Sequence, residues 1–279
     1  MSGASAISEA DGASDAERII SEQRSLWSAS PRDWAELAER ENEPLFEVVL
    51  DAAGVGDGTG LLDVACGSGL LLELAAARGA RTTGVDVTPE LLSIAAQRTP
   101  AADLRAHDMS ALPFADGEFD AVTGVNAFQF APSPALALAH AARVLKPGGT
   151  LVAAAFAEPE RNDGTALHLA MKSLVAEIDG EQDGYAPYAL SASGGLRRAL
   201  NEAGLRVVEI AELPVDWSYP DVPTTLRALL ASAGGARAAR AAGVERVREA
   251  LTNAMQQFIR EDGVVTMHNL FRYAIAVKS

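Results

Sequence analysis

Apolar and amphipathic stretches alternate along the first half of the chain. The apolar run 61–65 breaks into a turn of small residues at 66–69 and continues directly into the amphipathic stretch 70–78. This order predicts a strand, a glycine-rich loop and a helix, an arrangement in which backbone N–H groups and a helix N-terminus bind a ligand. We therefore expect a ligand site at the loop that contains Gly67 and Gly69.

The alternation continues downstream, and an acidic residue closes each of the next two apolar runs. Asp86 follows the run 81–85, and Asp108 lies just beyond the short run 101–106. In doubly wound folds, a carboxylate at the end of the second strand accepts hydrogen bonds from ribose hydroxyl groups. A carboxylate at the end of the third strand suits the exocyclic amine of an adenine lying across the same sheet edge. Asp86 alone fits NAD or S-adenosylmethionine equally well.

Capping residues mark the helix boundaries in this part of the chain. Thr88-Pro89-Glu90 and Ser133-Pro134 each place an N-cap residue before a first-turn proline. Lys146-Pro147-Gly148-Gly149 ends the second of these helices. Together with the alternating strands, these boundaries predict an α/β fold.

Two long insertions interrupt the alternation after Phe156. Residues 157–190 are polar, contain several glycines and prolines, and are too long for an ordinary connection. Residues 214–262 separate two strands and carry apolar side chains at helical spacing. We expect both to form a mostly helical lid over the ends of the strands. The predicted organisation is a flexible tail at 1–15 and a single domain at 16–279, with cap helices at 16–41, a core at 44–156, 191–213 and 264–279, and the two lid insertions.

Charge and composition exclude several classes of partner. A formal net charge of −15 and a pI near 4.7 oppose binding to nucleic acids or anionic membranes, because the long-range field has the wrong sign. No apolar stretch approaches the ~20 residues that span a bilayer, and the first residues lack a signal-peptide pattern. Four scattered histidines and one cysteine, Cys66, resemble no zinc site and form no intramolecular disulfide. We expect a cytoplasmic protein that binds a small molecule.

The loop and the two downstream carboxylates resemble the cofactor site of class I S-adenosylmethionine-dependent methyltransferases of the small-molecule type. The resemblance covers roughly residues 44–157 and includes the turn at 145–149. It implies a Rossmann-like doubly wound sheet, mostly parallel with an antiparallel last strand, and helices on both faces. It also implies S-adenosyl-L-methionine as cofactor and S-adenosyl-L-homocysteine as product. The implied cofactor-binding residues are Asp63, Ala65, Gly67, Ser68, Gly69, Asp86, Val87, Asp108, Met109, Asn126 and Trp34.

One position departs from the family pattern. Two other functions are alternatives to the methyltransferase assignment. Ala65 stands where the family usually has the first loop glycine, so the conformation of the loop is the feature most affected. A dinucleotide-dependent oxidoreductase has the same architecture, but its fingerprint requires a third glycine where this chain has Leu72. The second alternative stays open: a protein of this fold that catalyses a cyclisation or rearrangement of a metabolite without methyl transfer.

The segment after the fourth strand indicates the kind of acceptor. Asn126-Ala127-Phe128-Gln129 lacks the Asn-Pro-Pro-Tyr pattern of enzymes that methylate amino groups of nucleobases or amides. No carboxylate cluster accompanies it, since Asp120 belongs to the strand itself, so we predict no catalytic metal. The resemblance implies methyl transfer to oxygen, nitrogen or carbon of a small molecule, which we expect to be a secondary metabolite.

Because the methyl donor is already activated, alignment and exclusion of water can supply most of the catalysis. A side-chain base is needed only when the acceptor must lose a proton. The candidate bases are His168, His268 and His140. Four aromatic residues in or near the insertions predict either an aromatic substrate chamber or ordinary lid packing: Tyr185, Tyr188, Trp217 and Tyr219.

Overall fold

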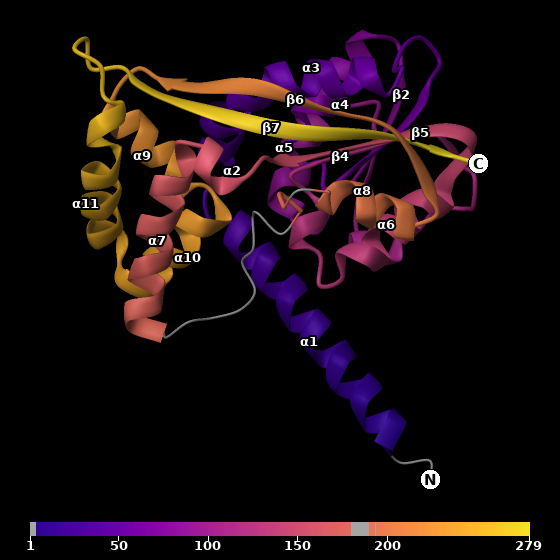
Figure 1. Ribbon diagram of the computed structural model, residues 1–279, viewed down its shortest axis with the longest axis horizontal. Coiled ribbons are helices and arrows are strands. Elements are labelled where there is room, and N and C mark those ends of the chain that lie inside the picture. The colour runs from indigo at the N-terminus through magenta and orange to yellow at the C-terminus, as the bar shows by residue number, and fades with distance from the viewer. Residues whose placement is uncertain (1–3, 180–189, 193) are drawn as a thin grey trace.

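The described residues form a seven-stranded sheet in the order β3-β2-β1-β4-β5-β7-β6 (Figure 1). The computed structural model describes residues 4–179, 190–192 and 194–279. The last strand in the chain, β7, is antiparallel to both of its neighbours, whereas the pairs from β3 to β5 are parallel. This confirms the predicted doubly wound sheet with an antiparallel last strand. The strands are β1 (Gly60–Val64), β2 (Arg81–Asp86), β3 (Asp103–Ala106), β4 (Phe119–Val125), β5 (Leu145–Phe156), β6 (Leu205–Tyr219) and β7 (Val265–Lys278).

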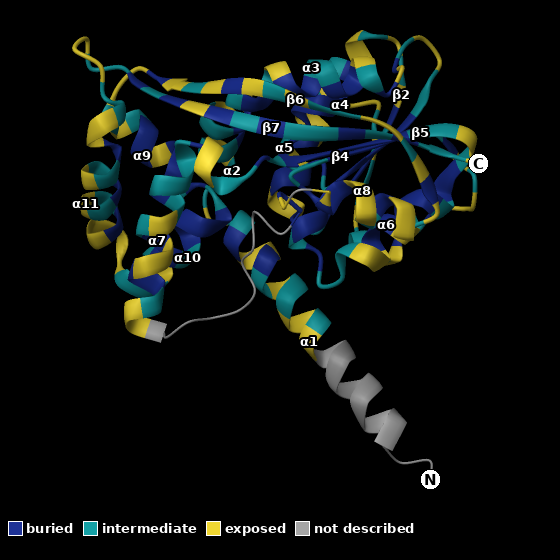
Figure 2. Cartoon of the chain, in the orientation of Figure 1, coloured by how far each residue is buried: buried dark blue, intermediate teal, exposed yellow. Residues whose placement is uncertain are grey.

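Helices cover both faces of the sheet, because successive residues of a strand point to opposite sides. Leu61 shares a buried cluster with α3 (Glu43–Ala52) and α4 (Leu70–Ala77). Its neighbour Leu62 belongs to the cluster on the other face, with α6 (Pro134–Val144) and α8 (Gly195–Glu202). α5 (Pro89–Arg98) packs against α4 and β3. Figure 2 shows the buried residues concentrated in the strands and on the inner sides of the surrounding helices.

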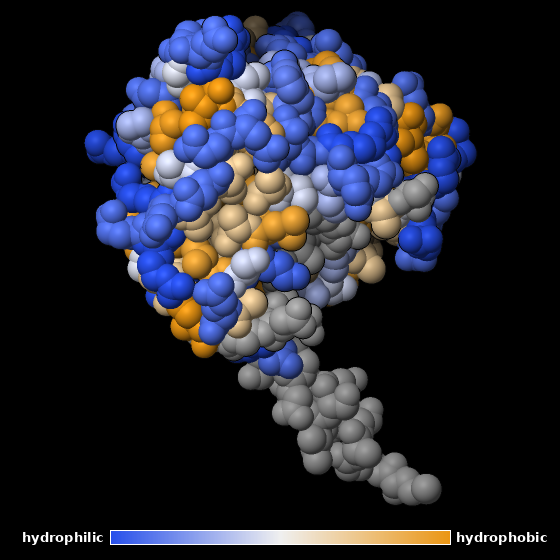
Figure 3. All heavy atoms as spheres, turned by 60° about the vertical axis from the view of Figure 1, so that its left-hand side comes forward, coloured by the Kyte–Doolittle hydropathy of each residue, from blue (hydrophilic) through white to orange (hydrophobic). Residues whose placement is uncertain are grey.

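Four of the described helices form a lid at one end of the sheet (Figure 1). They have a buried cluster of their own, in which Leu167, Leu226 and Leu251 pack against the far ends of β6 and β7. On the lid side of the molecule, Figure 3 shows hydrophobic patches interspersed among hydrophilic side chains. None of the described helices is long and apolar enough to cross a membrane. The lid helices are α7 (Gly164–Asp179), α9 (Val222–Leu230), α10 (Ala233–Ala242) and α11 (Val244–Met255).

The strand β6 extends beyond the core segment predicted at 191–213. It continues to Tyr219, which pairs with Val265. The sequence pattern places the start of the second insertion at Pro214, and a proline has no N–H group for a sheet ladder. β6 is the edge strand, however, and one side of its backbone needs no partner. The β6–β7 pair therefore extends past the other strands, and the lid helices pack against its far end.

The N-terminal segment packs against the lid. α1 (Ala4–Trp27) includes the first part of the cap helices predicted at 16–41. It also extends into the range predicted as a tail, whose flexibility stays a prediction. Leu26 is buried with Ala233 and Ala236 of α10, and Glu22 lies 3.0 Å from Arg237. The chain then continues through α2 (Pro31–Asp33), a short π-helix η1 (Trp34–Ala38) and a 3-10 turn η2 (Arg40–Asn42).

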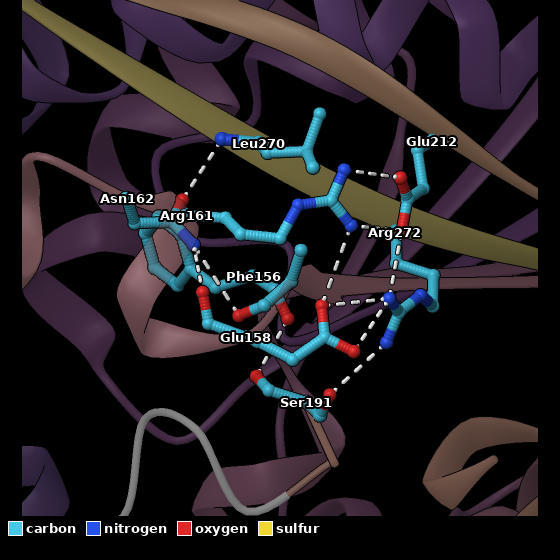
Figure 4. Close-up of polar contacts among 9 residues, drawn as sticks. Phe156, Glu158, Arg161, Asn162, Ser191, Glu212, Leu270 and Arg272 are labelled. Carbon is cyan, nitrogen blue, oxygen red and sulfur yellow. Dashed lines mark hydrogen bonds and ion pairs between the residues drawn. The ribbon is translucent and has the colours of Figure 1, made fainter. Parts of the chain in front are cut away.

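A polar network holds the two ends of the first insertion together (Figure 4). Arg272 of β7 donates to both carboxylate oxygens of Glu158 at 2.8 Å, to Glu212 of β6 at 2.7 Å and to the Ser191 carbonyl at 3.0 Å. Ser191 Oγ in turn donates to the carbonyl of Phe156 at 2.5 Å. These bonds hold the residues at the two ends of the first insertion next to the sheet. α7 extends from this point.

Candidate functional site

A cavity of about 220 Å³ lies where the parallel strands end, between the sheet and the lid. Residues from the N-terminal helices, from the segments that follow β1, β2, β3, β4 and β5, and from the lid all line it. Ligands of open α/β sheets bind at this edge. We name two parts of its wall. The loop side consists of Ala65, Gly67, Asp86, Val87, Asp108 and Met109, and the lid side of Asn42, Phe156, Leu167, His168, Met171 and Trp217.

The loop after β1 has a left-handed backbone at three positions. Gly67 and Gly69 have φ angles of 54° and 82°, and Ala65 has a φ of 58°. For a residue with a Cβ atom this conformation costs about 1–2 kcal/mol. Ala65 therefore adopts the conformation that a glycine favours, at a cost in stability. Gly69 also permits close packing, because a Cβ atom there would lie 2.7 Å from that of Ala95.

Asp86 connects the loop to the end of β2. One carboxylate oxygen accepts the Gly67 N–H at 2.9 Å, and the other accepts the Thr88 N–H at 2.8 Å. Burial raises the pKa of Asp86, and these backbone donors oppose the shift. Asp86 also lines the cavity, so its carboxylate can face a ligand there.

Three of the predicted cofactor residues do not line the cavity. Asp63 is buried beneath the loop, where its Oδ1 accepts the hydroxyl of Thr123 at 2.7 Å. Burial raises the pKa of Asp63 to about 7. Ser68 is fully buried, and Gly69 is the N-cap residue of α4. These positions support the loop from behind.

The other predicted cofactor residues line the cavity. Asp108 and Met109 follow β3, and Val87 follows Asp86. Asn126, just after β4, has a φ of 49°, a conformation that asparagine tolerates better than most residues. Trp34 reaches the loop from η1, with its Nε1 3.7 Å from the place of a Cβ atom on Gly67. The structure thus brings side chains from four separate segments to one wall.

Glu39 contacts the loop, although nothing in the sequence pattern indicated it. It is 4% exposed, accepts the hydroxyl of Ser68 at 2.6 Å and forms an ion pair with Arg98 of α5. Arg98 also donates to the Ser68 carbonyl at 3.0 Å and to the Ala35 carbonyl at 2.7 Å. Burial raises the pKa of Glu39, while the Arg98 charge lowers it. The pair lies 59 residues apart in the chain, a separation that no local spacing reveals.

Aromatic rings cover much of the remaining wall. Trp27 and Trp34 meet edge to face with centroids 4.7 Å apart, and Trp27 lies 6.1 Å from Phe130. On the lid side, Trp217 and Phe156 are 5.7 Å apart. Trp217 and Tyr219 line the cavity and also pack in the buried cluster of the lid, so their positions agree with both predicted alternatives. Tyr185 and Tyr188 lie outside the described residues.

The three candidate bases occupy different environments. His168 of α7 lines the cavity, where burial and the nearby Lys172 lower its pKa to about 4. His140 of α6 and His268 of β7 do not line the cavity. His268 is exposed, and its hydrogen bond to Asp216 at 2.8 Å raises its pKa. His107, which was not among the candidates, also lines the cavity.

Within the described part of the chain, no three His, Cys, Asp or Glu side chains gather as metal ligands do. The absence of a catalytic metal stays a prediction.

Comparisons with known proteins agree with this geometry. Residues 62–153 match the methyltransferase domain family. An uncharacterized protein of Mycobacterium tuberculosis is 39% identical over 137 residues, which are 48% of this chain and 49% of that protein. A demethylmenaquinone methyltransferase of Renibacterium salmoninarum is 42% identical over 112 residues, 40% of this chain and 47% of the relative. The chain thus spans about half the length of the curated relatives it matches.

Solved structures share the fold. A protein of Bacillus halodurans assigned to the methyltransferases has a TM-score of 0.56 and 21% identity, over 84% of this chain and 98% of that one. The [4+2]-cyclase SpnF has a TM-score of 0.54 and 20% identity, over 85% and 81% of the two chains. The geranyl diphosphate C-methyltransferase of Streptomyces coelicolor, solved with S-adenosyl-L-homocysteine, has a TM-score of 0.50 and 17% identity, over 86% and 80%.

Proposed function

We propose that this chain, whose residues 62–153 match the methyltransferase domain family, is a class I S-adenosylmethionine-dependent methyltransferase that transfers a methyl group from S-adenosylmethionine to oxygen, nitrogen or carbon of a small molecule. The observation that carries the proposal is the loop side of the cavity, where Asp86 and Asp108 end consecutive strands beside a left-handed loop. We retain a secondary metabolite as the proposed acceptor.

The residues present fit the cofactor. Asp86 lines the cavity at the end of β2, where a carboxylate suits the hydroxyl groups of a ribose. Asp108 supplies a carboxylate for the adenine amine, and Trp34 places an indole beside Gly67, where it can contribute cation–π or stacking energy of about 0.5–2 kcal/mol. S-adenosylmethionine, when bound, supplies a methyl group already activated as part of a sulfonium ion.

The chain would contribute alignment and exclusion of water. The loop side fixes one reactant and the aromatic lid side encloses the other, which converts a bimolecular step into an effectively unimolecular one. With its pKa near 4, His168 is neutral at pH 7 and can accept a hydrogen bond from an acceptor hydroxyl. So low a pKa makes it a weak base, and we expect no indispensable histidine.

Ligand binding tests the first half of the proposal. S-adenosylmethionine and S-adenosylhomocysteine should each raise the melting temperature and give a calorimetric binding isotherm, because a ligand that binds only the native state stabilises it. Binding of NAD with no response to either sulfur ligand would overturn the assignment.

Product analysis tests the second half against the alternative of cyclisation or rearrangement. The similarity to SpnF shows that a [4+2]-cyclase shares this fold, although at 20% identity it carries nothing about the reaction of this chain. A methyltransferase releases S-adenosylhomocysteine in an amount equal to a product heavier by one methylene. Turnover of an acceptor to a product of unchanged mass, with S-adenosylmethionine intact, would favour the alternative.

A further inference from the structure

All 23 Lys and Arg residues of the chain are among those that the structure describes, and none of them lines the cavity. Two acidic residues, Asp86 and Asp108, do line it on the loop side. An anionic ligand would therefore meet carboxylates in this cavity and no Lys or Arg side chain that could balance its charge.

Three cationic side chains adjoin residues of the cavity wall without lining the cavity. Arg24 Nε donates to the carbonyl of Val87 at 2.7 Å, and Arg98 forms its ion pair with Glu39 behind the loop. Lys172 follows Met171 in α7, but it is exposed. None of the three is placed to pair with a ligand inside the cavity.

The N-terminus of α7 also reaches the cavity, because Gly164 lines it. Backbone N–H groups at a helix N-terminus bind anions when they have no other acceptor. The first three N–H groups of α7 already have acceptors at 3.1 Å: Asn269 Oδ1 for Gly164, the Asn162 carbonyl for Thr165 and the Asp163 carbonyl for Ala166. This helix end therefore offers none of the three groups to an anion.

Apolar and aromatic side chains make up most of the lid side. Leu167 and Met171 come from α7 and are 1% and 6% exposed. Phe156 and Trp217 add two aromatic rings. Contact with such a wall stabilises a ligand in proportion to the apolar surface that the ligand removes from water. The lid side therefore favours an apolar ligand.

Two titratable side chains in the wall indicate how this surrounding acts on charge. His168 lines the cavity from α7, and burial lowers its pKa to about 4. Tyr219 lines the cavity from β6, and burial raises its pKa. The cation is disfavoured at the first position and the anion at the second. The common cause is the loss of hydration, which acts in the same way on an ionic group of a ligand.

We propose that the lid side selects the methyl acceptor by charge, and that the part of the acceptor that it encloses is apolar and carries no ionic group. Phosphates and ionised carboxylates are excluded from this part because they would lose their hydration without gaining a counter-charge. This inference rests on the proposed function, because the ligand of the lid side is the methyl acceptor.

Four aromatic probes test the site by calorimetry on protein saturated with S-adenosylhomocysteine, in which no methyl transfer occurs. 2-Naphthamide is uncharged, whereas 2-naphthoate is an anion and 2-naphthylmethylammonium a cation of similar size. Benzamide is uncharged but lacks the second ring. We expect 2-naphthamide to bind at least about 10-fold more tightly than either ion, because an ionic group is costly to desolvate. It should bind at least about 3-fold more tightly than benzamide, because it buries more apolar surface.

A cation placed in the wall should reduce the discrimination against the anion. Met171→Lys introduces an ammonium group on the lid side. The affinity for 2-naphthoate relative to that for 2-naphthamide should rise at least about 10-fold over wild type, because the anion gains a counter-charge. Leu169→Lys is the matched control: it adds the same charge to α7, but Leu169 is 54% exposed and does not line the cavity. Its affinity ratio should stay within about 2-fold of wild type, because solvent and salt screen an exposed charge.

The outcomes separate this inference from the proposed function. If the wild type fails to bind S-adenosylhomocysteine, the proposed function is wrong. If it binds S-adenosylhomocysteine but binds either ion or benzamide as tightly as 2-naphthamide, or binds no 2-naphthamide at millimolar concentration, only the selection by charge is overturned. The same holds if Met171→Lys leaves the affinity ratio unchanged, or if Leu169→Lys changes it equally. The wild-type ligand series decides the matter even if Met171→Lys fails to fold.

Discussion

The loop side and the lid side of the cavity are built in different ways. On the loop side, both oxygens of Asp86 accept backbone N–H groups, and Ser68 is bonded to a buried ion pair behind it. On the lid side, apolar packing between helices predominates. Hydrogen bonds orient the polar groups of the loop side in advance, whereas apolar packing shapes the lid side. The following predictions test this contrast, from the largest expected effect to the smallest.

Breaking the ion pair behind the loop should have the largest effect. Glu39→Ala leaves Arg98, whose side chain is 13% exposed, without its partner, and such a loss typically costs about 3–5 kcal/mol. Urea unfolding would measure this fall in the free energy of unfolding. Glu36→Ala, an exposed change one turn earlier, should cost less than about 0.5 kcal/mol. Equal stability of the two variants would show that the ion pair does not support the loop.

Asp63 should make the loop side more stable at lower pH. Its pKa is about 7 in the folded protein and about 3.9 in the unfolded chain, so only the folded state binds this proton between those values. The free energy of unfolding therefore falls as the pH rises from about 4 to 7, by as much as about 4 kcal/mol from this group. The side chain introduced by Asp63→Asn cannot ionise. The difference in free energy of unfolding between this variant and the wild type should therefore shift in favour of the variant as the pH rises from about 4 to about 7. Parallel pH curves for the two proteins would contradict the buried protonated state.

His168 should make the lid side respond in the opposite direction. Its pKa is about 4 in the folded protein, against about 6.5 when unfolded. Between these two values only the unfolded chain binds the His168 proton. The free energy of unfolding is therefore highest above about pH 6.5 and falls by up to about 3 kcal/mol as the pH decreases toward about 4. His168→Gln should lose less stability than wild type between pH 7 and 4.5 in urea unfolding. The exposed His268 serves as the control, because Asp216 raises its pKa and its contribution has the opposite sign. A steeper loss in His168→Gln would rule out a buried neutral histidine.

Removing the carboxylate of Asp86 should weaken cofactor binding by about 100-fold. Hydrogen bonds to a charged acceptor contribute about 1.5–3 kcal/mol, and this carboxylate both orients the loop and faces the ligand. Calorimetric titration with S-adenosylhomocysteine measures the change. Asp120→Ala is the matched control: Asp120 also accepts a backbone N–H, from Gly60 at 2.9 Å, but at the opposite end of the strands. If both variants bound the ligand alike, Asp86 would have no role in the site.

Relieving the strain at Ala65 should have the smallest effect. Ala65→Gly removes about 1–2 kcal/mol of left-handed strain and adds about 0.4–1 kcal/mol of unfolded-state entropy. We expect a net gain in stability of up to about 1.6 kcal/mol, measured by thermal unfolding. Ala75→Gly, in the middle of α4, should instead destabilise the fold by a similar amount. Destabilisation by Ala65→Gly would mean that the methyl group makes a packing contact that outweighs the strain.

The sequence by itself determined the features whose parts lie close together in the chain. The strand, the loop and the following helix are consecutive, so their hydrophobic pattern predicted the loop at Gly67 and the carboxylate of Asp86. The order of parallel strands then brought Asp108 to the same edge, because the carboxyl ends of neighbouring parallel strands coincide.

Only the tertiary structure decided the features that depend on distant segments. Pro214 gave no sign that its strand lies at a sheet edge, and so the length of β6 was underestimated. The sequence did not distinguish the candidate histidines from one another. In the structure, burial lowers the pKa of His168, whereas Asp216 raises the pKa of the exposed His268. Asn42 and Trp217 meet one cavity only because η2 packs on the extended β6. Such contacts join segments that are far apart in the sequence. The periodicity of hydrophobic residues within a segment does not indicate which distant segment it will contact.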